Sequence, residues 1–414
     1  MEDFQNLTDV CKENRRLAGT VVDNFLLEYS DFQDRTARDM DRRLKAFAEV
    51  AKEIPEEYVN MLRAQYMAHR IFRKNGLLKK YLNHRDLKEL PAEERTYLEK
   101  QLANPWRFSF AIIQNQPADD FFEMWDVFSD QNYLLYSPGM ATTLKERSPI
   151  LWLNLIAFNG HCWETYGPII GYEGFTPDDV FFFATELRPG KNFETDEEIY
   201  EDMETDPVPY MMLMTGATYP LTFNGDDAIL NLVAEYETGS FDPYQLKETF
   251  EVVESDGVFR LLPGEAEEGF PFSAAYYDED QGMILLYSMT DSGFETLVDS
   301  LNRTGFDFSK EADIRLTMAM MTTAGKILGR TIELNPYEEL FAGDVDEDEE
   351  EESELLERTN HFLSLVIEDL NEGREPNVGE SAAQAGIEID AAQEIYNDVV
   401  EKINRAGKGN GGNT

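Results

Sequence analysis

Cysteine is scarce in this chain, and its scarcity limits the chemistry that the chain can perform. Among 414 residues only Cys11 and Cys162 are cysteines, and they lie in different predicted domains. Because they share no paired spacing, they predict neither a disulfide framework nor a cysteine zinc site. Histidine is also rare, and no two of the four histidines have the spacing of metal ligands. We therefore expect no metal and no cofactor.

Long apolar runs and mechanistic motifs are missing as well. The chain has no apolar run long enough to span a membrane, and its first thirty residues mix acidic and basic side chains throughout. These absences predict a cytoplasmic protein. There is also no glycine-rich phosphate loop, no serine nucleophile elbow and no His-Glu-x-x-His motif. The sequence therefore favours a protein that is not an enzyme.

Basic residues are few compared with acidic ones. The chain has 36 Lys and Arg against 82 Asp and Glu, which gives a formal net charge of −46. A charge of this size repels nucleic acid and anionic membranes. Two interpretations stay open, because a halophilic source would give the same balance as an acidic surface that binds a basic partner.

The first 103 residues are the exception to this acidity. They hold 19 basic and 19 acidic residues, which leaves 17 against 63 for the rest of the chain. We predict partner binding by eight basic residues that are accompanied only by Asp86, namely Arg63, Arg70, Arg73, Lys74, Lys79, Lys80, Arg85 and Lys88. They would face a phosphate backbone or an acidic protein, or else pair with acidic domains of the same chain.

The spacing of apolar residues predicts an α+β chain of several domains. Residues 1–103 have helical spacing and predict a helical bundle, in which Met61, Leu62, Gln65, Tyr66, His69 and Phe72 form one apolar face. Residues 104–190 alternate with period two and include all four tryptophans, which predicts a small antiparallel β-barrel-like unit. The prediction continues with five further segments. They are an acidic linker at 191–209, an α+β domain at 210–341, an acidic linker at 342–353, a C-terminal helical segment at 354–405 and a disordered tail at 406–414.

The predicted α+β domain contains both clear and ambiguous segments. We predict a strand at 209–214, helices at 226–237 and 243–252, and a hairpin formed by 272–277 and 283–288. A helix that is capped by Asp291 or Ser292 and strands at 315–322 and 331–334 follow. Residues 382–396 have the spacing of a helix-turn-helix, but its second helix is acidic, which predicts a small bundle that does not bind DNA.

Two groups of acidic residues are candidate metal ligands. One group contains Asp119, Asp120, Glu123 and Asp126, and the other contains Asp178 and Asp179. In a chain with 82 acidic residues such groups arise by chance, and Asp179 has the position of a capping residue at a helix start. We therefore predict no metal site. His161 is expected in a turn, and the aromatic residues of the β unit are expected in its core.

The segment 121–137 resembles the strand, turn and strand unit of bacterial proteins that have a SEC-C zinc motif. It reads Phe-Phe-Glu-Met-Trp-Asp-Val-Phe-Ser-Asp-Gln-Asn-Tyr-Leu-Leu-Tyr-Ser, and the segment from Ala275 to Leu301 is similar to their second conserved segment. The resemblance covers roughly Asn104 to Leu334. The cysteine-rich zinc motif of that family is absent from this chain. The resemblance implies a cytoplasmic bacterial adaptor.

These observations together predict a non-enzymatic cytoplasmic adaptor or interaction protein. Its acidic body would bind a basic protein partner, and its N-terminal helices would form a second docking face. A metal-dependent hydrolase or nuclease that uses carboxylates is an alternative function. A nucleic-acid binder that acts through residues 63–88 is a second alternative.

Overall fold

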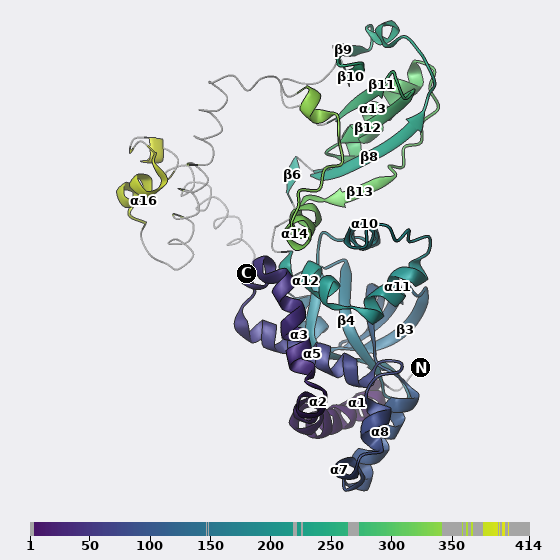
Figure 1. Ribbon diagram of the computed structural model, residues 1–414, viewed down its shortest axis with the longest axis vertical. Coiled ribbons are helices and arrows are strands. Elements are labelled where there is room, and N and C mark those ends of the chain that lie inside the picture. Colours follow the sequence, from purple (N-terminus) through teal and green to yellow (C-terminus); the bar gives the residue numbers. More distant parts are fainter. Residues whose placement is uncertain are drawn as a thin grey trace, which may run out of the picture. The chain divides into compact units, whose positions relative to one another are not determined.

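The computed structural model describes residues 4–145, 147, 149–217, 222–224, 227–263 and 273–341, together with positions 358, 362, 366, 376–387, 389, 391–393 and 396. The chain divides into two compact units, Met1–Pro336 and Tyr337–Thr414. The predicted α+β multidomain class is confirmed, since the first unit has N-terminal helices, a closed barrel and a second antiparallel sheet (Figure 1). No helix in this described part of the chain combines the length and the apolar character that crossing a bilayer requires.

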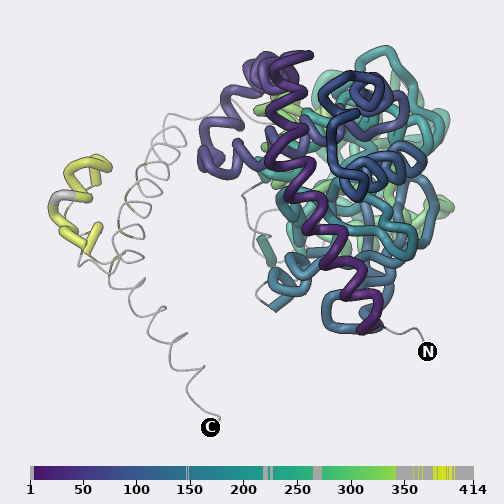
Figure 2. Tube along the Cα trace, turned by 90° about the horizontal axis from the view of Figure 1, so that it is seen from below, coloured from purple at the N-terminus to yellow at the C-terminus, as the bar shows by residue number. Residues whose placement is uncertain are grey.

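Helices form nearly all of the first hundred residues. They are α1 (Phe4–Ala18), η1 (Gly19–Leu26), α2 (Leu27–Asp34), α3 (Thr36–Leu44), η2 (Lys45–Phe47), α4 (Ala48–Ala51), α5 (Glu56–Phe72), α6 (Leu78–Leu82), α7 (Arg85–Lys88) and α8 (Ala92–Ala103). The elements α1, η1 and α2 follow one another without a break and form one long rod (Figure 2). The middle part of this rod, η1, is a π-helix, which is a rare form.

The helix α5 has the apolar face that its sequence predicts, with one correction. Leu62, Tyr66 and Phe72 are buried, as are Gln65 and His69. Met61, which we expected on the same face, is 46% exposed. Its position one residue before Leu62 turns it by about 100° around the helix, toward solvent.

Five strands close into the barrel that the alternating pattern predicts. They are β1 (Arg107–Ala118), β2 (Phe121–Asp126), β3 (Gln131–Tyr136), β4 (Leu151–Phe158) and β5 (Trp163–Tyr172), in the order β1-β2-β3-β5-β4. All neighbours are antiparallel except β3 and β5, which run parallel through only two residue pairs, Leu135 with Trp163 and Tyr136 with Glu164. We call this short contact the barrel seam.

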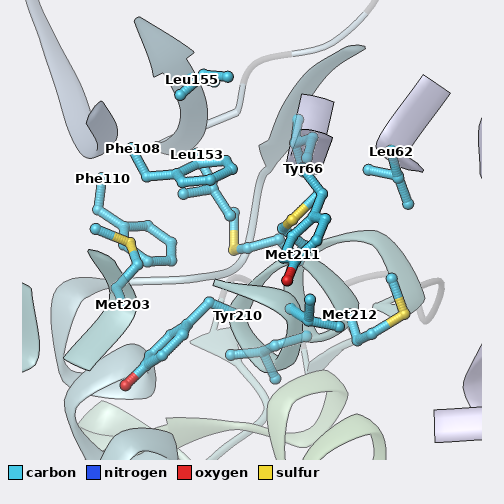
Figure 3. Packing of buried hydrophobic residues seen from close by; sticks show 14 of the residues in the cluster. Leu62, Tyr66, Phe108, Phe110, Leu153, Leu155, Met203, Tyr210, Met211 and Met212 are labelled. Carbon is cyan, nitrogen blue, oxygen red and sulfur yellow. The ribbon is translucent and has the colours of Figure 1, made fainter. Parts of the chain in front are cut away.

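The largest hydrophobic core lies where helices cover the barrel. Four further helices belong to this part of the fold, α9 (Pro138–Thr143), α10 (Pro177–Leu187), α11 (Asp196–Thr205) and α12 (Val208–Gly216). Figure 3 shows side chains of α5, β1, β4, α11 and α12 in contact, and it labels Leu62, Tyr66, Phe108, Phe110, Leu153, Leu155, Met203, Tyr210, Met211 and Met212. All of these are buried, so their removal from water is a major source of the stability of this unit.

The helix α12 corrects the strand that the sequence predicts at 209–214. Every residue from Tyr210 to Met214 is buried, so the run has no polar face that would reveal its period. Such a short apolar run fits a buried helix as well as a buried strand. The proline at the second helical position is compatible with a helix start and not with a central strand.

The second sheet has six strands in the order β13-β8-β12-β11-β10-β9. Its elements are β8 (Leu230–Glu237), β9 (Phe250–Ser255), β10 (Val258–Pro263), β11 (Ser273–Asp278), β12 (Met283–Ser288) and β13 (Ile314–Thr317), beside the small pair β6 (Phe223–Asn224) and β7 (Asp227–Ala228). The helix α13 (Asp291–Arg303) packs on one face of this sheet through Phe294, Leu297 and Leu301. The predicted hairpin is confirmed as β11 and β12.

Several predictions in this region are wrong. The predicted helix at 226–237 is largely the strand β8, and the one at 243–252 is the short η3 (Pro243–Leu246) followed by β9. The predicted strand at 315–322 changes at Met318 into α14 (Met318–Leu328), and residues 331–334 form no strand. The helix α13 is capped by Thr290, whose hydroxyl accepts the N–H of Gly293 at 3.1 Å, and not by Asp291 or Ser292.

The predicted capping role of Asp179 is confirmed, and it extends to a second helix. Asp179 is fully buried in the first turn of α10, where it accepts the N–H of Thr176 at 2.8 Å. It also accepts the N–H of Thr317, the residue that caps α14, at 2.9 Å. Burial raises the pKa of Asp179, although hydrogen bonds from both threonines oppose this shift. One carboxylate therefore serves the N-termini of two helices.

In the second unit, α16 (Val378–Ala385) ends at Gly386, which has a φ of 70°. A small core contains Phe362, Val366, Ala382 and Ala392. A short segment, η4 (Glu338–Leu340), precedes it in the sequence. The predicted acidic linker at 342–353 and the predicted tail at 406–414 lie outside the described residues.

Candidate functional site

A groove of about 730 Å³ lies where α2 meets α3, beside the end of α5. Half of its lining residues are basic, and we call it the cationic groove. It is lined by Asp34, Arg35, Thr36, Arg38, Asp39, Asp41, Arg42, Lys45, Arg70 and Leu77.

The corner between α2 and α3 depends on an unusual backbone conformation at Arg35. Its φ of 56° and ψ of 43° are left-handed, which costs a residue with a side chain about 1 kcal/mol. Its N–H donates to the carbonyl of Asp31 at 2.9 Å, and its own carbonyl accepts the N–H of Asp39 at 3.0 Å. The corner is thus fixed from both helices, and it places Arg35 in the groove lining. Strained backbone of this kind is concentrated at functional sites.

Two of the three carboxylates in the groove lining are neutralised by cations of α5 and α6. Asp34 accepts hydrogen bonds from the ammonium of Lys80 and from the hydroxyl of Tyr81, the latter at 2.7 Å. Burial opposes ionisation of Asp34, but these two donors outweigh it and lower its pKa. Asp41 pairs with Arg63 at 2.8 Å.

The third carboxylate, Asp39, is held by three donors. Its oxygens accept hydrogen bonds from Tyr66, Arg42 and Arg43. Burial again opposes ionisation, and the hydroxyl of Tyr66 together with the two guanidinium groups lowers the pKa of Asp39. Each acidic residue of the groove lining therefore already has a cationic partner.

Four cations of the groove are left over. Arg35, Arg38, Lys45 and Arg70 form no ion pair with any carboxylate in the described part of the chain. Positive charge accumulates next to them as well, since burial and the charge of Arg70 lower the pKa of Arg73. A local surplus of positive charge thus exists in a chain whose net charge is −46.

The structure distributes the eight basic residues that the sequence singles out. Arg70 lines the groove, and Arg63 and Lys80 hold its carboxylates. Arg73 donates to the carbonyl oxygen of Glu204 at 2.9 Å, and Arg85 pairs with Glu89 at 3.2 Å. The remaining three, Lys74, Lys79 and Lys88, are exposed.

Sequence reasoning missed Arg35, Arg38 and Lys45. A signal for them exists, because residues 35–45 contain five basic residues against two acidic ones. The even charge count of the whole N-terminal segment hid this excess. Residues 35–45 and 63–88 come together only because α3 packs against α5.

The predicted acidic group near the first hairpin does not converge on one point. Asp126 is buried and engaged by Arg107 at 2.8 Å and by Ser109 at 2.6 Å, whereas Glu123 is exposed. Asp126 thus neutralises a buried arginine inside the barrel. Within the described ranges, no three His, Cys, Asp or Glu side chains are arranged to hold a metal ion.

Comparisons with known protein families, with curated proteins and with solved structures give no match to this chain. The resemblance to proteins with a SEC-C motif therefore stays a prediction.

Proposed function

We propose that this chain is a non-enzymatic interaction protein whose cationic groove binds an acidic segment of a protein partner. The observation that supports this function is a set of four cations, Arg35, Arg38, Lys45 and Arg70, that have no ion pair within the described residues and surround carboxylates that already have partners. Three of the four are arginines, whose planar guanidinium groups bind carboxylates through two parallel hydrogen bonds. An incoming Asp or Glu side chain would find donors without having to displace an internal partner.

An acidic peptide fits the groove better than a nucleic acid does. A long phosphate backbone would extend beyond the groove and meet a chain with a net charge of −46, which repels it. No aromatic side chain among the described residues lines the groove, so it offers no platform on which a base could stack. A peptide presents a few carboxylates over a short length and avoids both problems.

The acidic body is the second docking surface of this proposal and would bind a basic partner. Its carboxylates crowd at the start of α11, where burial and the charges of Asp130 and Asp178 raise the pKa of Asp196. A cation that a partner brings to this surface would relieve the repulsion. The two surfaces have opposite charge, so one chain would join partners of opposite charge.

The affinity of the full chain for a labelled Glu-rich peptide, measured by fluorescence anisotropy, tests the proposal. We expect Arg38→Ala and Arg70→Ala each to weaken binding about tenfold, because each removes a charge-assisted contact. Arg85→Ala is the matched control and should leave the affinity unchanged, since Arg85 lies on α7 outside the groove lining and is paired with Glu89.

A wild-type chain that does not bind the peptide would refute the proposal, and so would an equal loss in all three variants. A labelled single-stranded oligonucleotide is measured in parallel. Tighter binding of the oligonucleotide, with the same dependence on Arg38 and Arg70, would replace the acidic peptide by a nucleic acid as the partner.

A further inference from the structure

The two cysteines lie next to each other, contrary to what their positions in the sequence predict. Cys11 on α1 and Cys162 at the start of β5 are 151 positions apart in the sequence, but their Sγ atoms are only 3.5 Å apart. Neither cysteine forms a disulfide bond within the described residues, and both side chains are buried. A disulfide bond has a length of about 2.05 Å, so the sulfur atoms need to approach by roughly 1.5 Å to form one.

An amide and a carboxylate lie beside the pair, which distinguishes it from cysteines that only fill an apolar core. The side-chain amide nitrogen of Asn159 lies 3.3 Å from the sulfur of Cys11 and 3.5 Å from that of Cys162. The same nitrogen donates to Glu164 Oε1 at 2.7 Å. It has two hydrogens for three acceptors, so the two sulfurs and the carboxylate share its donors. We call these four residues the thiol site.

The orientation of Asn159 follows from its backbone contacts. Its Oδ1 accepts the N–H of His161 at 2.9 Å and the N–H of Cys162 at 3.0 Å. These two bonds require that the amide nitrogen, and not the oxygen, faces the sulfurs and Glu164. The hydrogen-bond donor is therefore held in place by the turn that connects β4 to β5.

Glu164 is a buried carboxylate with an incomplete set of partners. Its side chain is 4% exposed, and its Oε2 has no hydrogen bond within the described residues, although Arg15 Nε lies 3.7 Å away. Burial raises the pKa of Glu164 to about 7, against the lowering effect of Asn159 and Arg15. The hydrogen bond with Cys162, burial and the charge of Glu164 all raise the pKa of Cys11. Glu164 thus restrains the ionisation of the Cys11 thiol.

The thiol site lies at the barrel seam. Glu164 is one of the two β5 residues that pair with β3, and Cys162 directly precedes the other. Cys11 packs with Phe121 and Tyr136 at the same place, so α1 covers the seam. A covalent bond between Cys11 and Cys162 would therefore fasten α1 over the shortest strand contact of the barrel.

We propose that Cys11 and Cys162 are a redox-active pair that hydrogen peroxide converts into a reversible disulfide. One thiolate attacks a peroxide oxygen, the O–O bond breaks, and the released hydroxide takes the thiol proton to give water and a sulfenic acid. The second sulfur then displaces the sulfenic hydroxyl, which leaves as water with the second thiol proton as the S–S bond forms. Each sulfur loses one electron and the peroxide gains two. A small dithiol reverses the reaction through exchange.

The test treats the folded full chain with hydrogen peroxide and follows its mass and its free thiols. We expect the intact chain to lose two hydrogen atoms, a peptide map to contain Cys11 joined to Cys162, and dithiothreitol to restore both thiols. The oxidised chain should also unfold at a temperature about 5 °C higher, since the crosslink closes a long loop. Two free thiols after the treatment, or separate overoxidation of each cysteine, would overturn the proposal.

Variants separate the proposed chemistry from a packing role. Cys11→Ala and Cys162→Ala should stop at a sulfenic acid that dimedone traps, because no second sulfur is present. At pH 8, where Glu164 is largely ionised, Glu164→Gln keeps the shape of the side chain, removes its charge, and should oxidise several-fold faster than wild type. Equal or slower oxidation of this variant, with a native circular dichroism spectrum, would contradict the restraining role of Glu164.

Discussion

The cationic groove and the thiol site shift the pKa values of their carboxylates in opposite directions. In the groove, Asp34 and Asp39 are partly exposed, and cations and hydroxyl groups lower their pKa values although burial opposes this. In the thiol site, burial outweighs the available donors and raises the pKa of Glu164 to about 7. Among the described residues, four cations of the groove have no carboxylate partner, and Oε2 of Glu164 in the thiol site accepts no hydrogen bond. The positions of the few cations therefore determine the ionisation of the carboxylates in these two sites more than the large number of acidic residues does.

The largest effect is expected for Asp179, a carboxylate outside both sites that is buried like Glu164 but accepts hydrogen bonds at both of its oxygens. Asp179→Ala should lower the free energy of unfolding by about 3 to 4 kcal/mol, because it removes the acceptor at two helix N-termini. Chemical denaturation measures this loss. Asp178→Ala is the matched control, since the neighbouring Asp178 is exposed and should cost only a few tenths of a kcal/mol. Equal losses in the two variants would show that the hydrogen bonds are not the cause.

The free energy of unfolding should depend on pH by about 3 kcal/mol through Glu164, and Glu164→Gln should remove this dependence. The folded chain keeps Glu164 protonated up to about pH 7, compared with an ordinary pKa of 4.5. Its stabilising contribution is therefore complete below pH 4.5 and is lost as the pH rises through 7. Denaturation at pH 5 and pH 8 should show a smaller difference in the variant than in wild type. Glu123→Gln, at an exposed position of β2, should retain the wild-type difference.

Asp39→Asn tests a carboxylate of the groove whose pKa is lowered by its partners. It should lower the free energy of unfolding by about 2 kcal/mol, because three donors lose a charged acceptor. It should also tighten binding of the Glu-rich peptide, since it adds to the positive surplus. Asp41→Asn, which breaks one exposed ion pair with Arg63, should cost less than about 1 kcal/mol. Weaker peptide binding by Asp39→Asn would contradict the proposed role of the surplus cations.

The smallest effect on stability is expected for Arg35→Gly. Glycine adopts the left-handed conformation without strain, so the free energy of unfolding should stay within about 1 kcal/mol of wild type. Affinity for the Glu-rich peptide should fall about tenfold because one cation of the groove is lost. Denaturation and anisotropy on the same preparation separate the two effects. An unchanged affinity would exclude Arg35 from binding.

The sequence predicts the barrel and the hairpin of β11 and β12 because their apolar residues alternate. It fails at β8, where Leu, Ala and Glu favour a helix but pairing with β12 on one side and β13 on the other decides the outcome. It fails at α12 because a run that is buried on all sides has no period. In the candidate site it finds Arg70 but not Arg35, since the two meet only through the packing of α3 on α5.

The contact of Cys11 with Cys162 could not have been predicted from spacing at all. A separation of 151 residues places no limit on the distance between two side chains. Only the return of β5 to the barrel seam, where α1 also lies, brings them together. The pairing of β3 with β5 is parallel and short, and it leaves no pattern in the sequence.

The position of α1 over the barrel seam also sets the order in which this protein can assemble during its synthesis. The ribosome completes α1 about 150 residues before the segment from Cys162 to Glu164, which α1 covers, emerges. At the usual rates of elongation this delay is roughly 10 to 30 s. Until then α1 lacks its contact with Cys162 and Glu164, and from residue 136 onward the edge of β3 that pairs with β5 is free. A nascent chain that stalls between residues 136 and 163 would keep this edge of β3 unpaired, and an unpaired strand edge can pair with another chain.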